Sequence, residues 1–287
     1  MKKQWLVVLI SLVCMVGFQN CSKVEFSGTE DSATKGGNPD LPGDPGGNPG
    51  GDDGGGTIDQ PCEDVAAIQR HTKIVFVVDT SGSNVKNCRS GDMDCVPATD
   101  PMKAFRGGAI ETFFNKYQAK TNFEWGFFTF SGSSARSLID DGVSERLSNT
   151  AAEMSQAIVD FKSVKDEGGT PYKAALSLVK RTIEADADLN AASDPQYVVV
   201  FISDGYPSDY NIVGDFASSQ AASDIDALKA VAPGRVSLSS IFYGNLQEPE
   251  AVQLLTDMAA RGDGQFKNVA AGGTIEIDDL IPGKVCQ

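Results

Sequence analysis

The stretch IVFVVDTSGSN, residues 74–84, indicates the type of fold, because a strand that is apolar on both faces ends inside it. Its first five residues, Ile74 to Val78, are all apolar, as expected of a strand covered on both sides by other elements. Asp79 follows at once, and two hydroxyl side chains come at alternate positions, Ser81 and Ser83. The stretch therefore predicts a buried parallel strand whose carboxyl end carries a polar site.

Further segments extend this strand into a predicted sheet of six. Four are apolar runs, and a weaker fifth follows SGSS closely enough to form an antiparallel hairpin with the strand before it. They are Phe123–Phe130, Tyr197–Ile202, Val236–Tyr243, the short Gln265–Val269 and the weaker Arg136–Ile139.

Helical segments separate most of these strands, and most of them carry recognisable start or stop signals. Asp100-Pro101 predicts a start, Thr150 with Glu153 predicts a capping box, and Thr170-Pro171 predicts another start. The predicted helices end near Tyr117, Phe161, Val179, Val231 (before Pro233) and Ala260 (before Gly262), and Ile275–Ile281 is compatible with either a helix or a strand. The alternation predicts an α/β fold: a doubly wound, mostly parallel six-stranded sheet with helices on both faces.

Two more polar residues are expected at the edge that holds Asp79. Asp204 directly follows the strand Tyr197–Ile202, and Thr170 stands in a glycine-containing loop at a helix start. Carboxylate and hydroxyl oxygens without histidine or thiolate select Mg²⁺, Mn²⁺ or Ca²⁺. Each residue alone is also an ordinary turn or cap residue. Their order and spacing together favour a metal site.

The pattern resembles a known family. Asp-x-Ser-x-Ser after a first buried strand, a downstream Thr, and Asp-Gly after a later strand are similar to the metal-ion-dependent adhesion site of von Willebrand factor type A (VWA) domains. The resemblance covers residues 72–285, and all five signature positions are filled. It implies a doubly wound sheet with one antiparallel edge strand. It also implies that Ser81, Ser83 and Thr170 contact the ion directly or through water, and that Asp79 and Asp204 bind it directly or hold its waters.

A cation held largely by neutral hydroxyls keeps an open position and much of its charge. We therefore expect a protein-binding module, for adhesion or as a scaffold, that captures an Asp or Glu side chain of a protein partner. A metal-dependent hydrolase and an accessory partner of an ATPase complex are the alternatives. With one histidine and no Cys–His pair or nucleophile elbow, we expect no enzyme.

The N-terminal region predicts export. Residues 1–20 have the two lysines and short apolar core of a signal peptide, and Cys21 stands where a lipoprotein signal is cleaved and lipidated. Residues 21–61 are rich in Gly, Pro and Asp, which predicts a flexible linker, and 62–287 form the predicted VWA domain. We expect a lipid-anchored protein of the outer membrane, with a periplasmic or secreted protein as the alternative. The net charge of −15 argues against nucleic acid as a partner.

Four cysteines remain in the expected mature domain, and an even number in an oxidising compartment predicts two disulfides. Of the three possible pairings we favour Cys88–Cys95, which closes a short loop, with Cys62–Cys286, which ties the two ends of the domain together. A zinc site is disfavoured, since no Cys-x-x-Cys spacing exists and the only histidine is His71, for which we expect a structural role.

Overall fold

The computed structural model describes residues 70–85, 98–140, 142, 144–210, 216–244, 248–269 and 273–281. All of them belong to one compact unit, Ile58–Gln287. Cys21 and the four cysteines of the predicted disulfides (Cys62, Cys88, Cys95, Cys286) lie outside the described residues, as do the expected signal peptide and linker. These remain predictions.

The unit is built on a six-stranded sheet with the strand order β3-β2-β1-β4-β5-β6. Only β3 is antiparallel to its neighbour, and the other pairs are parallel, which confirms the predicted doubly wound α/β sheet with one antiparallel edge strand. The strands are β1 (Thr72–Asp79), β2 (Phe123–Ser131), β3 (Ser134–Ser137), β4 (Gln196–Ser203), β5 (Val236–Phe242) and β6 (Asp263–Asn268).

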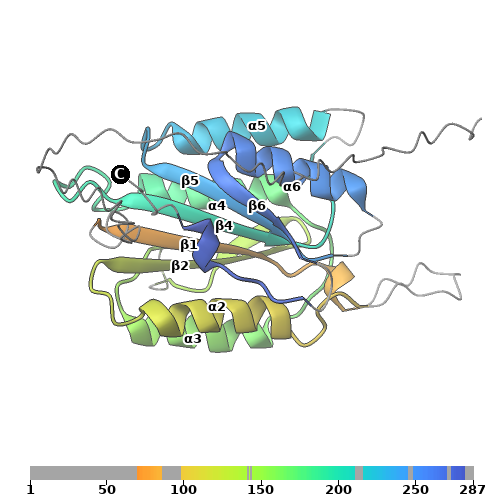
Figure 1. The fold of residues 1–287 in the computed structure, drawn as a ribbon, viewed down its shortest axis with the longest axis horizontal. Helices are drawn as coiled ribbons and strands as arrows, with labels where there is room; N and C mark the ends of the chain where they lie inside the picture. The colour runs from red at the N-terminus through yellow and green to blue at the C-terminus, as the bar shows by residue number, and fades with distance from the viewer. Residues whose placement is uncertain are drawn as a thin grey trace, which may run out of the picture. The chain divides into compact units, whose positions relative to one another are not determined.

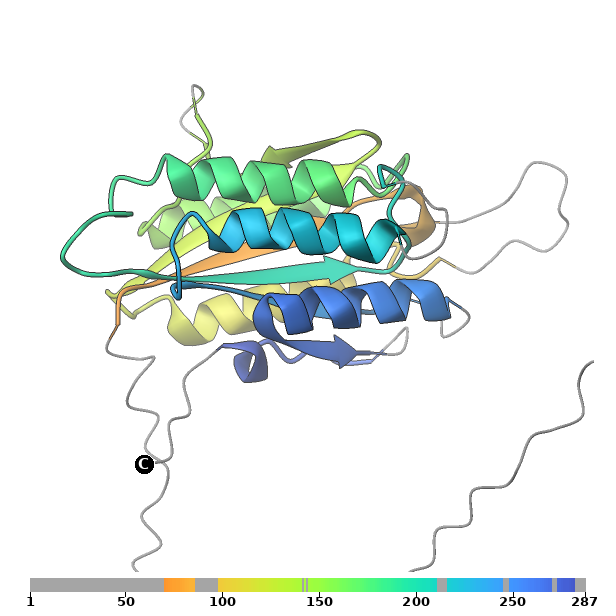
Figure 2. The ribbon, with the colours of Figure 1, turned by 90° about the horizontal axis from the view of Figure 1, so that it is seen from above.

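Helices cover both faces of this sheet (Figure 1). The described helices are α2 (Ala104–Tyr117), α3 (Ala151–Ser163), α4 (Tyr172–Glu184), α5 (Phe216–Lys229) and α6 (Pro249–Arg261), with short 3-10 helices η1 (Gly82–Asn84) and η2 (Asp278–Leu280). Helices α2 and α3 lie on one face, and α4, α5 and α6 lie on the other, as the view from above also shows (Figure 2). Among the described residues, no helix combines the length and the hydrophobicity that a membrane crossing requires.

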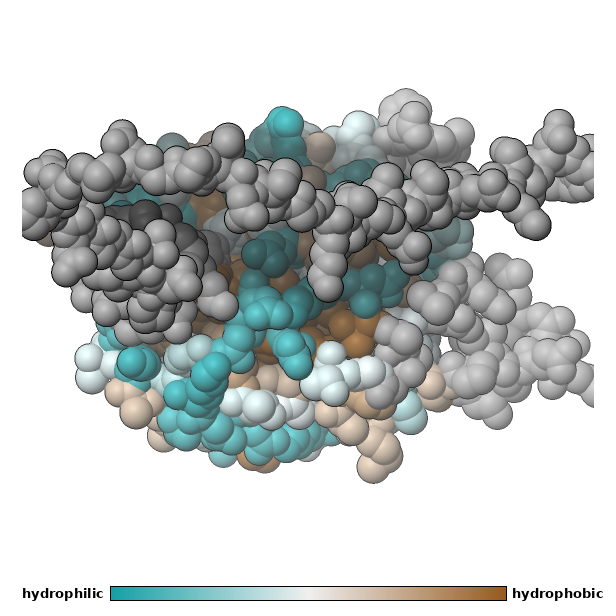
Figure 3. Space-filling view, viewed as in Figure 1, coloured by the Kyte–Doolittle hydropathy of each residue, from teal (hydrophilic) through white to brown (hydrophobic). Residues whose placement is uncertain are grey.

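Alternation along β1 divides the core into two halves. Ile74, Phe76 and Val78 pack towards α2 and α3, whereas Val75 and Val77 pack towards α4, α5 and α6. All five side chains are completely buried, as expected of a central parallel strand. Hydrophobic residues are visible in the recess of the face shown in Figure 3, and hydrophilic residues gather in front of it.

The structure corrects three local predictions. The hairpin strand lies at Ser134–Ser137 rather than 136–139, because Ser131 pairs directly with Ser134 across a two-residue turn. The α2 helix begins at Ala104 rather than at Pro101, because Lys103 takes a left-handed conformation with φ of 55°. The segment Ile275–Ile281 is neither a long helix nor a strand but contains only the single turn η2.

The predicted capping box at α3 is also wrong in detail, although the helix starts where it was expected. Thr150 is the N-cap residue but makes no side-chain capping bond. Glu153 instead accepts hydrogen bonds from Ser148 and Arg146, and both partners lower the pKa of its carboxyl group. The Glu153 carboxylate therefore holds the segment that precedes α3 and does not cap the backbone N–H groups of its first turn.

Candidate metal centre

The carboxyl edge of the sheet brings the five predicted site residues together on three loops. Parallel strands all point their carboxyl ends to the same edge, so the loops after β1 and β4 meet there. Four of the residues are buried, with exposures of 0% for Asp79, 1% for Ser81, 7% for Thr170 and 3% for Asp204. Ser83 is partly exposed.

Asp79, the last residue of β1, is held by hydrogen bonds to both of its carboxylate oxygens. Oδ1 accepts the backbone N–H of Ser81 at 2.7 Å, which folds the loop back on the strand end. Oδ2 accepts the hydroxyl of Ser203 on β4 at 2.5 Å. The carboxylate thus has a fixed orientation between the two central strands.

Ser81, Ser83 and Asp204 form a continuous chain of hydrogen-bonded oxygens. The hydroxyl oxygens of Ser81 and Ser83 lie 3.0 Å apart, and Ser83 donates to Oδ1 of Asp204 at 2.8 Å. The other oxygen of this carboxylate, Oδ2, is buried and accepts no hydrogen bond of normal geometry from the described residues, although the hydroxyl of Thr99 lies near enough to the carboxylate to influence its pKa. An unpartnered buried carboxylate oxygen is costly unless a cation or water meets it.

Thr170 reaches the site because its loop is tied to the first loop through backbone hydrogen bonds. Gly82 N–H donates to Gly168 O at 3.0 Å, and Glu167 N–H donates to Thr80 O at 2.9 Å. A Cβ atom placed on Gly205 would lie 3.8 Å from Thr170 Oγ1 and 3.9 Å from Ser83 Oγ. The hydroxyls of the first and second loops therefore border the same small space beside Asp204.

Ser208 ties this loop to the one after β4, although the sequence did not single it out. Its hydroxyl accepts the Thr170 N–H at 2.9 Å, and its own N–H donates to Thr170 O at 2.9 Å. Tyr172, fully buried, donates its hydroxyl to Gly205 O at 2.7 Å. All three loops are thereby cross-connected, so the positions of the five oxygen-bearing residues depend on one another.

A buried ion network that the sequence analysis missed supports the loop from below. Arg106 of α2 is completely buried and donates to the backbone carbonyl of Asp79. It also pairs with Asp100 at 3.0 Å and Asp166 at 3.1 Å, while Lys103 pairs with Asp166 at 2.9 Å. The signal available in the sequence was an arginine on the apolar face of a predicted helix.

The charges around the site do not balance. The four carboxylates of Asp79, Asp204, Asp100 and Asp166 face two cationic side chains, Arg106 and Lys103. Burial, and then the nearby charge of Asp204, raise the pKa of Asp79 to about 7. Burial also raises the pKa of Asp204. Without a cation, both carboxyl groups therefore hold their protons more tightly than usual. When both are ionised, the four carboxylates exceed the two cationic side chains of the described residues by two charges, which suits one divalent cation.

The donor set fits a hard divalent cation. It combines carboxylate and hydroxyl oxygens only, with no imidazole or thiolate among the described residues of this edge. The buried Oδ2 of Asp204 points to a missing electropositive partner. The structure thus brings all five predicted residues together, and whether they bind a metal remains to be tested.

Comparisons with known proteins give similarity of fold at low identity. No protein-family model matches the chain, and no curated protein matches it. Several solved structures are similar. The SpRpn10 VWA domain has 11% sequence identity, covering 70% of this chain and 88% of that chain, with a TM-score of 0.45. The vWF domain of the type V pili tip protein Mfa5 from Porphyromonas gingivalis has 10% identity, covering 70% of this chain and 90% of that chain, with a TM-score of 0.46. The manganese-loaded Plasmodium vivax TRAP protein has 17% identity, covering 68% of this chain and 64% of that chain, with a TM-score of 0.42. Likenesses at this level neither establish a family for the chain nor say what it binds.

Proposed function

We propose that Asp79, Ser81, Ser83, Thr170 and Asp204 bind one divalent cation, Mg²⁺ or else Mn²⁺ or Ca²⁺, and that the chain uses this site to bind a protein partner. The observation that carries the proposal is the buried, unpartnered Oδ2 of Asp204 beside a second buried carboxylate. Both carboxyl groups have raised pKa values, so a cation would stabilise their charged forms.

When bound, the cation supplies a positive charge and an open coordination position for a carboxylate of the partner. The chain's own residues set how much of that charge remains. Ser81, Ser83 and Thr170 offer neutral hydroxyls, which leave the charge of a cation largely uncompensated. Ser203 and the Ser81 N–H hold the two oxygens of Asp79, which fixes its carboxylate in place. An Asp or Glu side chain of the partner is the ligand that such a site favours.

The partner is thus captured rather than chemically changed. The one histidine of the chain precedes β1 and lies at the opposite edge of the sheet, so no imidazole is available here for proton transfer. With the predicted signal peptide, Cys21 lipidation and linker, we propose a tethered adhesion or scaffold module of the cell envelope.

A pull-down from envelope extracts tests this function. Wild-type protein, Asp79→Ala and the matched control Asp226→Asn are compared with Mg²⁺ and with EDTA. Asp226 is a suitable control, since it is an exposed carboxylate that pairs with Arg261 on the surface. We expect a partner that is retained by wild type and by Asp226→Asn with Mg²⁺, and lost with EDTA or with Asp79→Ala. A partner held equally by wild type and Asp79→Ala in EDTA would contradict the proposal.

A further inference from the structure

A second cluster of charged residues lies at the amino end of the sheet, opposite the site described above. The register places Lys73 of β1 beside Glu124 of β2 on one side and beside Tyr197 of β4 on the other. Residues paired across neighbouring strands point to the same face. His71 precedes β1 by one residue and lies eight residues from Asp79, or roughly 25 Å along the strand. The two clusters are therefore separate.

Lys73 forms the floor of this cluster. Its side chain is completely buried, and its ammonium group lies 2.9 Å from Glu124 Oε2, 2.8 Å from Asp186 Oδ2 and 2.8 Å from Asp188 Oδ2. Asp186 and Asp188 come from the connection between α4 and β4. Asp186 also accepts the hydroxyl of Tyr197 at 2.7 Å, so it is fully engaged below the surface.

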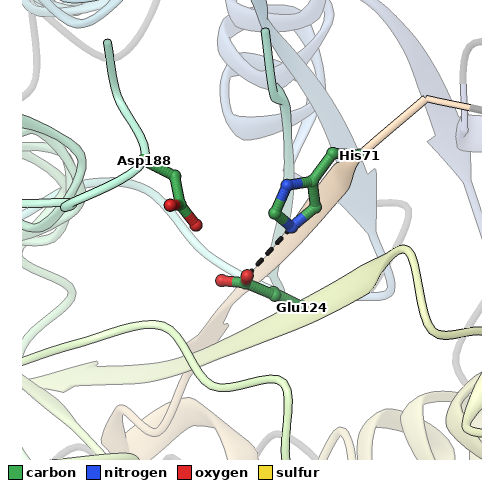
Figure 4. A group of neighbouring side chains, drawn as sticks. All are labelled: His71, Glu124 and Asp188. Carbon is green, nitrogen blue, oxygen red and sulfur yellow. Dashed lines mark hydrogen bonds and ion pairs between the residues drawn. The ribbon is translucent and has the colours of Figure 1, made fainter. Parts of the chain in front are cut away.

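His71, Glu124 and Asp188 form the outer rim. The Nε2 atom of His71 lies 2.9 Å from Glu124 Oε1, and Lys73 lies 2.9 Å from the other oxygen, Oε2. One ligand atom from each residue lies within 4.8 Å of the others. Figure 4 shows the three side chains directed towards one another from the residue before β1, from β2 and from the α4–β4 connection. The side chains of His71 and Asp188 are 22% and 40% exposed, so solvent reaches the rim.

The charges of this cluster are unbalanced too. Glu124, Asp186 and Asp188 carry three negative charges against the single positive charge of Lys73. Lys73 lowers the pKa of Asp188, so this carboxylate is charged at neutral pH. An imidazole beside two carboxylates, in a cluster of described residues with an excess of two negative charges, matches the needs of one divalent cation.

We propose that His71, Glu124 and Asp188 form a second metal site, which takes Zn²⁺ or a similar borderline transition metal rather than Mg²⁺. An imidazole with two carboxylates is a ligand set that zinc accepts readily, whereas Mg²⁺ prefers oxygen ligands alone. Water completes the coordination. Lys73 holds Oε2 of Glu124 and Oδ2 of Asp188 from below, as hydrogen-bonded groups behind metal-ligating carboxylates do elsewhere.

The present spacing is close to what such a site requires. Ligands about 2.0–2.1 Å from a tetrahedral zinc lie about 3.3 Å from one another. His71 Nε2 and Glu124 Oε1 already lie 2.9 Å apart, and the ligand atoms of the three residues all lie within 4.8 Å of one another. A shift of the exposed Asp188 side chain closes the remaining distance. This site does not depend on the function proposed for the carboxyl edge.

Because the chain has a single histidine, NMR of the imidazole nitrogens tests the site without assignment by mutation. The experiment uses the oxidised full chain, purified without a histidine tag, and adds ZnCl₂ or MgCl₂. We expect one equivalent of Zn²⁺ to move the Nε2 resonance of His71 and to abolish its titration with pH, and Mg²⁺ to leave it unchanged. An imidazole signal that excess Zn²⁺ does not move would overturn the proposal.

Calorimetry with zinc identifies the carboxylate ligands. The background is Asp79→Ala with Asp204→Asn, which removes the first site. We expect His71→Gln and Asp188→Asn each to weaken Zn²⁺ binding by more than about 10-fold. Asp194→Asn is the matched control, since this acidic residue of the same connection pairs with Arg235 instead, and its zinc affinity should equal that of the background. Equal zinc affinities in the background protein and in all three variants would contradict the proposal and leave only an ion cluster around Lys73 at this edge.

Discussion

At the scale of single residues, Asp79 and Asp204 are the unusual groups of the molecule. Asp79 is the last residue of β1, and Asp204 directly follows β4. Both are almost completely buried, and they lie close enough for the charge of Asp204 to raise the pKa of Asp79. The hydroxyls of Ser203 and Ser83 and the backbone N–H of Ser81 donate to three of their four oxygens. The fourth, Oδ2 of Asp204, accepts no hydrogen bond from the described residues.

The raised pKa predicts that metal binding depends on pH. Asp79 has a pKa of about 7 without metal, so below this pH a cation must displace a proton from it. We expect the apparent affinity for Mg²⁺ or Mn²⁺ to fall by up to about tenfold per pH unit below 7 and to level off above it. Titration calorimetry from pH 5.5 to 8 measures this, and an affinity that is the same throughout that range would contradict it.

The same shift has a consequence for the stability of the metal-free protein. Folding raises the pKa of Asp79 from 3.8 to about 7, so the folded state binds this proton more tightly than the unfolded state. The metal-free protein therefore loses stability as pH rises from about 4 to about 7. Because metal compensates the charge that remains, it should raise the melting temperature more at pH 8 than at pH 5.5, as thermal unfolding with and without EDTA would show.

At the scale of elements, the strands were predictable from the sequence because their apolar runs are long and continuous. The start of α2 was not, because its cap differs from the usual one. The carboxylate of Asp100 accepts the backbone N–H groups of Phe105 and Arg106 at 3.2 and 3.1 Å, across the left-handed Lys103. This cap lies outside the local pattern that a helix start usually shows. The residues of the site were predictable, whereas the supporting network was not.

That network makes Arg106 a residue on which α2 and the β1 loop both depend. Arg106→Met leaves Asp100 and Asp166 with fewer counter-charges in the interior, and we expect a loss of roughly 3–5 kcal/mol in the free energy of unfolding. Urea denaturation measures it. Arg261→Met is the control, since the Arg261–Asp226 pair is exposed to solvent and its loss should change the free energy of unfolding little. Similar losses in both variants would show that the buried network is unimportant.

The loop that carries Thr170 passes close to the turn between β2 and β3, and this approach depends on Gly168. Its φ is +76°, and a Cβ atom there would lie 2.7 Å from Gly132 Cα. We expect Gly168→Ala to cost at least about 1–2 kcal/mol and to weaken metal binding, because it displaces Thr170. Gly108→Ala in α2 is the control: a Cβ there meets nothing within 4 Å, and we expect stabilisation by about 0.5–1 kcal/mol. Unchanged stability and metal affinity in Gly168→Ala would contradict this account of the loop.

At the scale of the whole molecule, the sheet separates two charged clusters by the length of β1. The carboxyl edge gathers oxygen ligands on three loops, which is the usual place for sites in open parallel sheets. The amino edge gathers His71, Glu124 and Asp188 around a buried lysine. The sequence indicated the first cluster, because Asp, Ser and Thr follow strands in a recognisable order. The sequence did not indicate the second cluster, because its residues lie far apart in the sequence and the strand register determines which of them meet.

The predicted disulfides join segments outside the described residues, and peptide mapping of the oxidised protein tests them. We expect Cys88–Cys95 and Cys62–Cys286 in non-reducing digests, and a lower melting temperature after reduction. By the chain-entropy model, the longer bridge contributes up to about 5 kcal/mol and the shorter one about 2.5 kcal/mol. Free thiols at these four cysteines, or either of the two other pairings, would show the prediction to be wrong.

We propose that the carboxyl edge binds one hard divalent cation through five residues, Asp79, Ser81, Ser83, Thr170 and Asp204. Calorimetric titration of the chelator-stripped protein with MgCl₂ and MnCl₂ at pH 8 tests it most directly. We expect one binding event per chain in wild type and in Asp226→Asn, and none in Asp204→Asn. If wild type gives no binding with either metal, or if Asp204→Asn binds as tightly as wild type, the claim is contradicted.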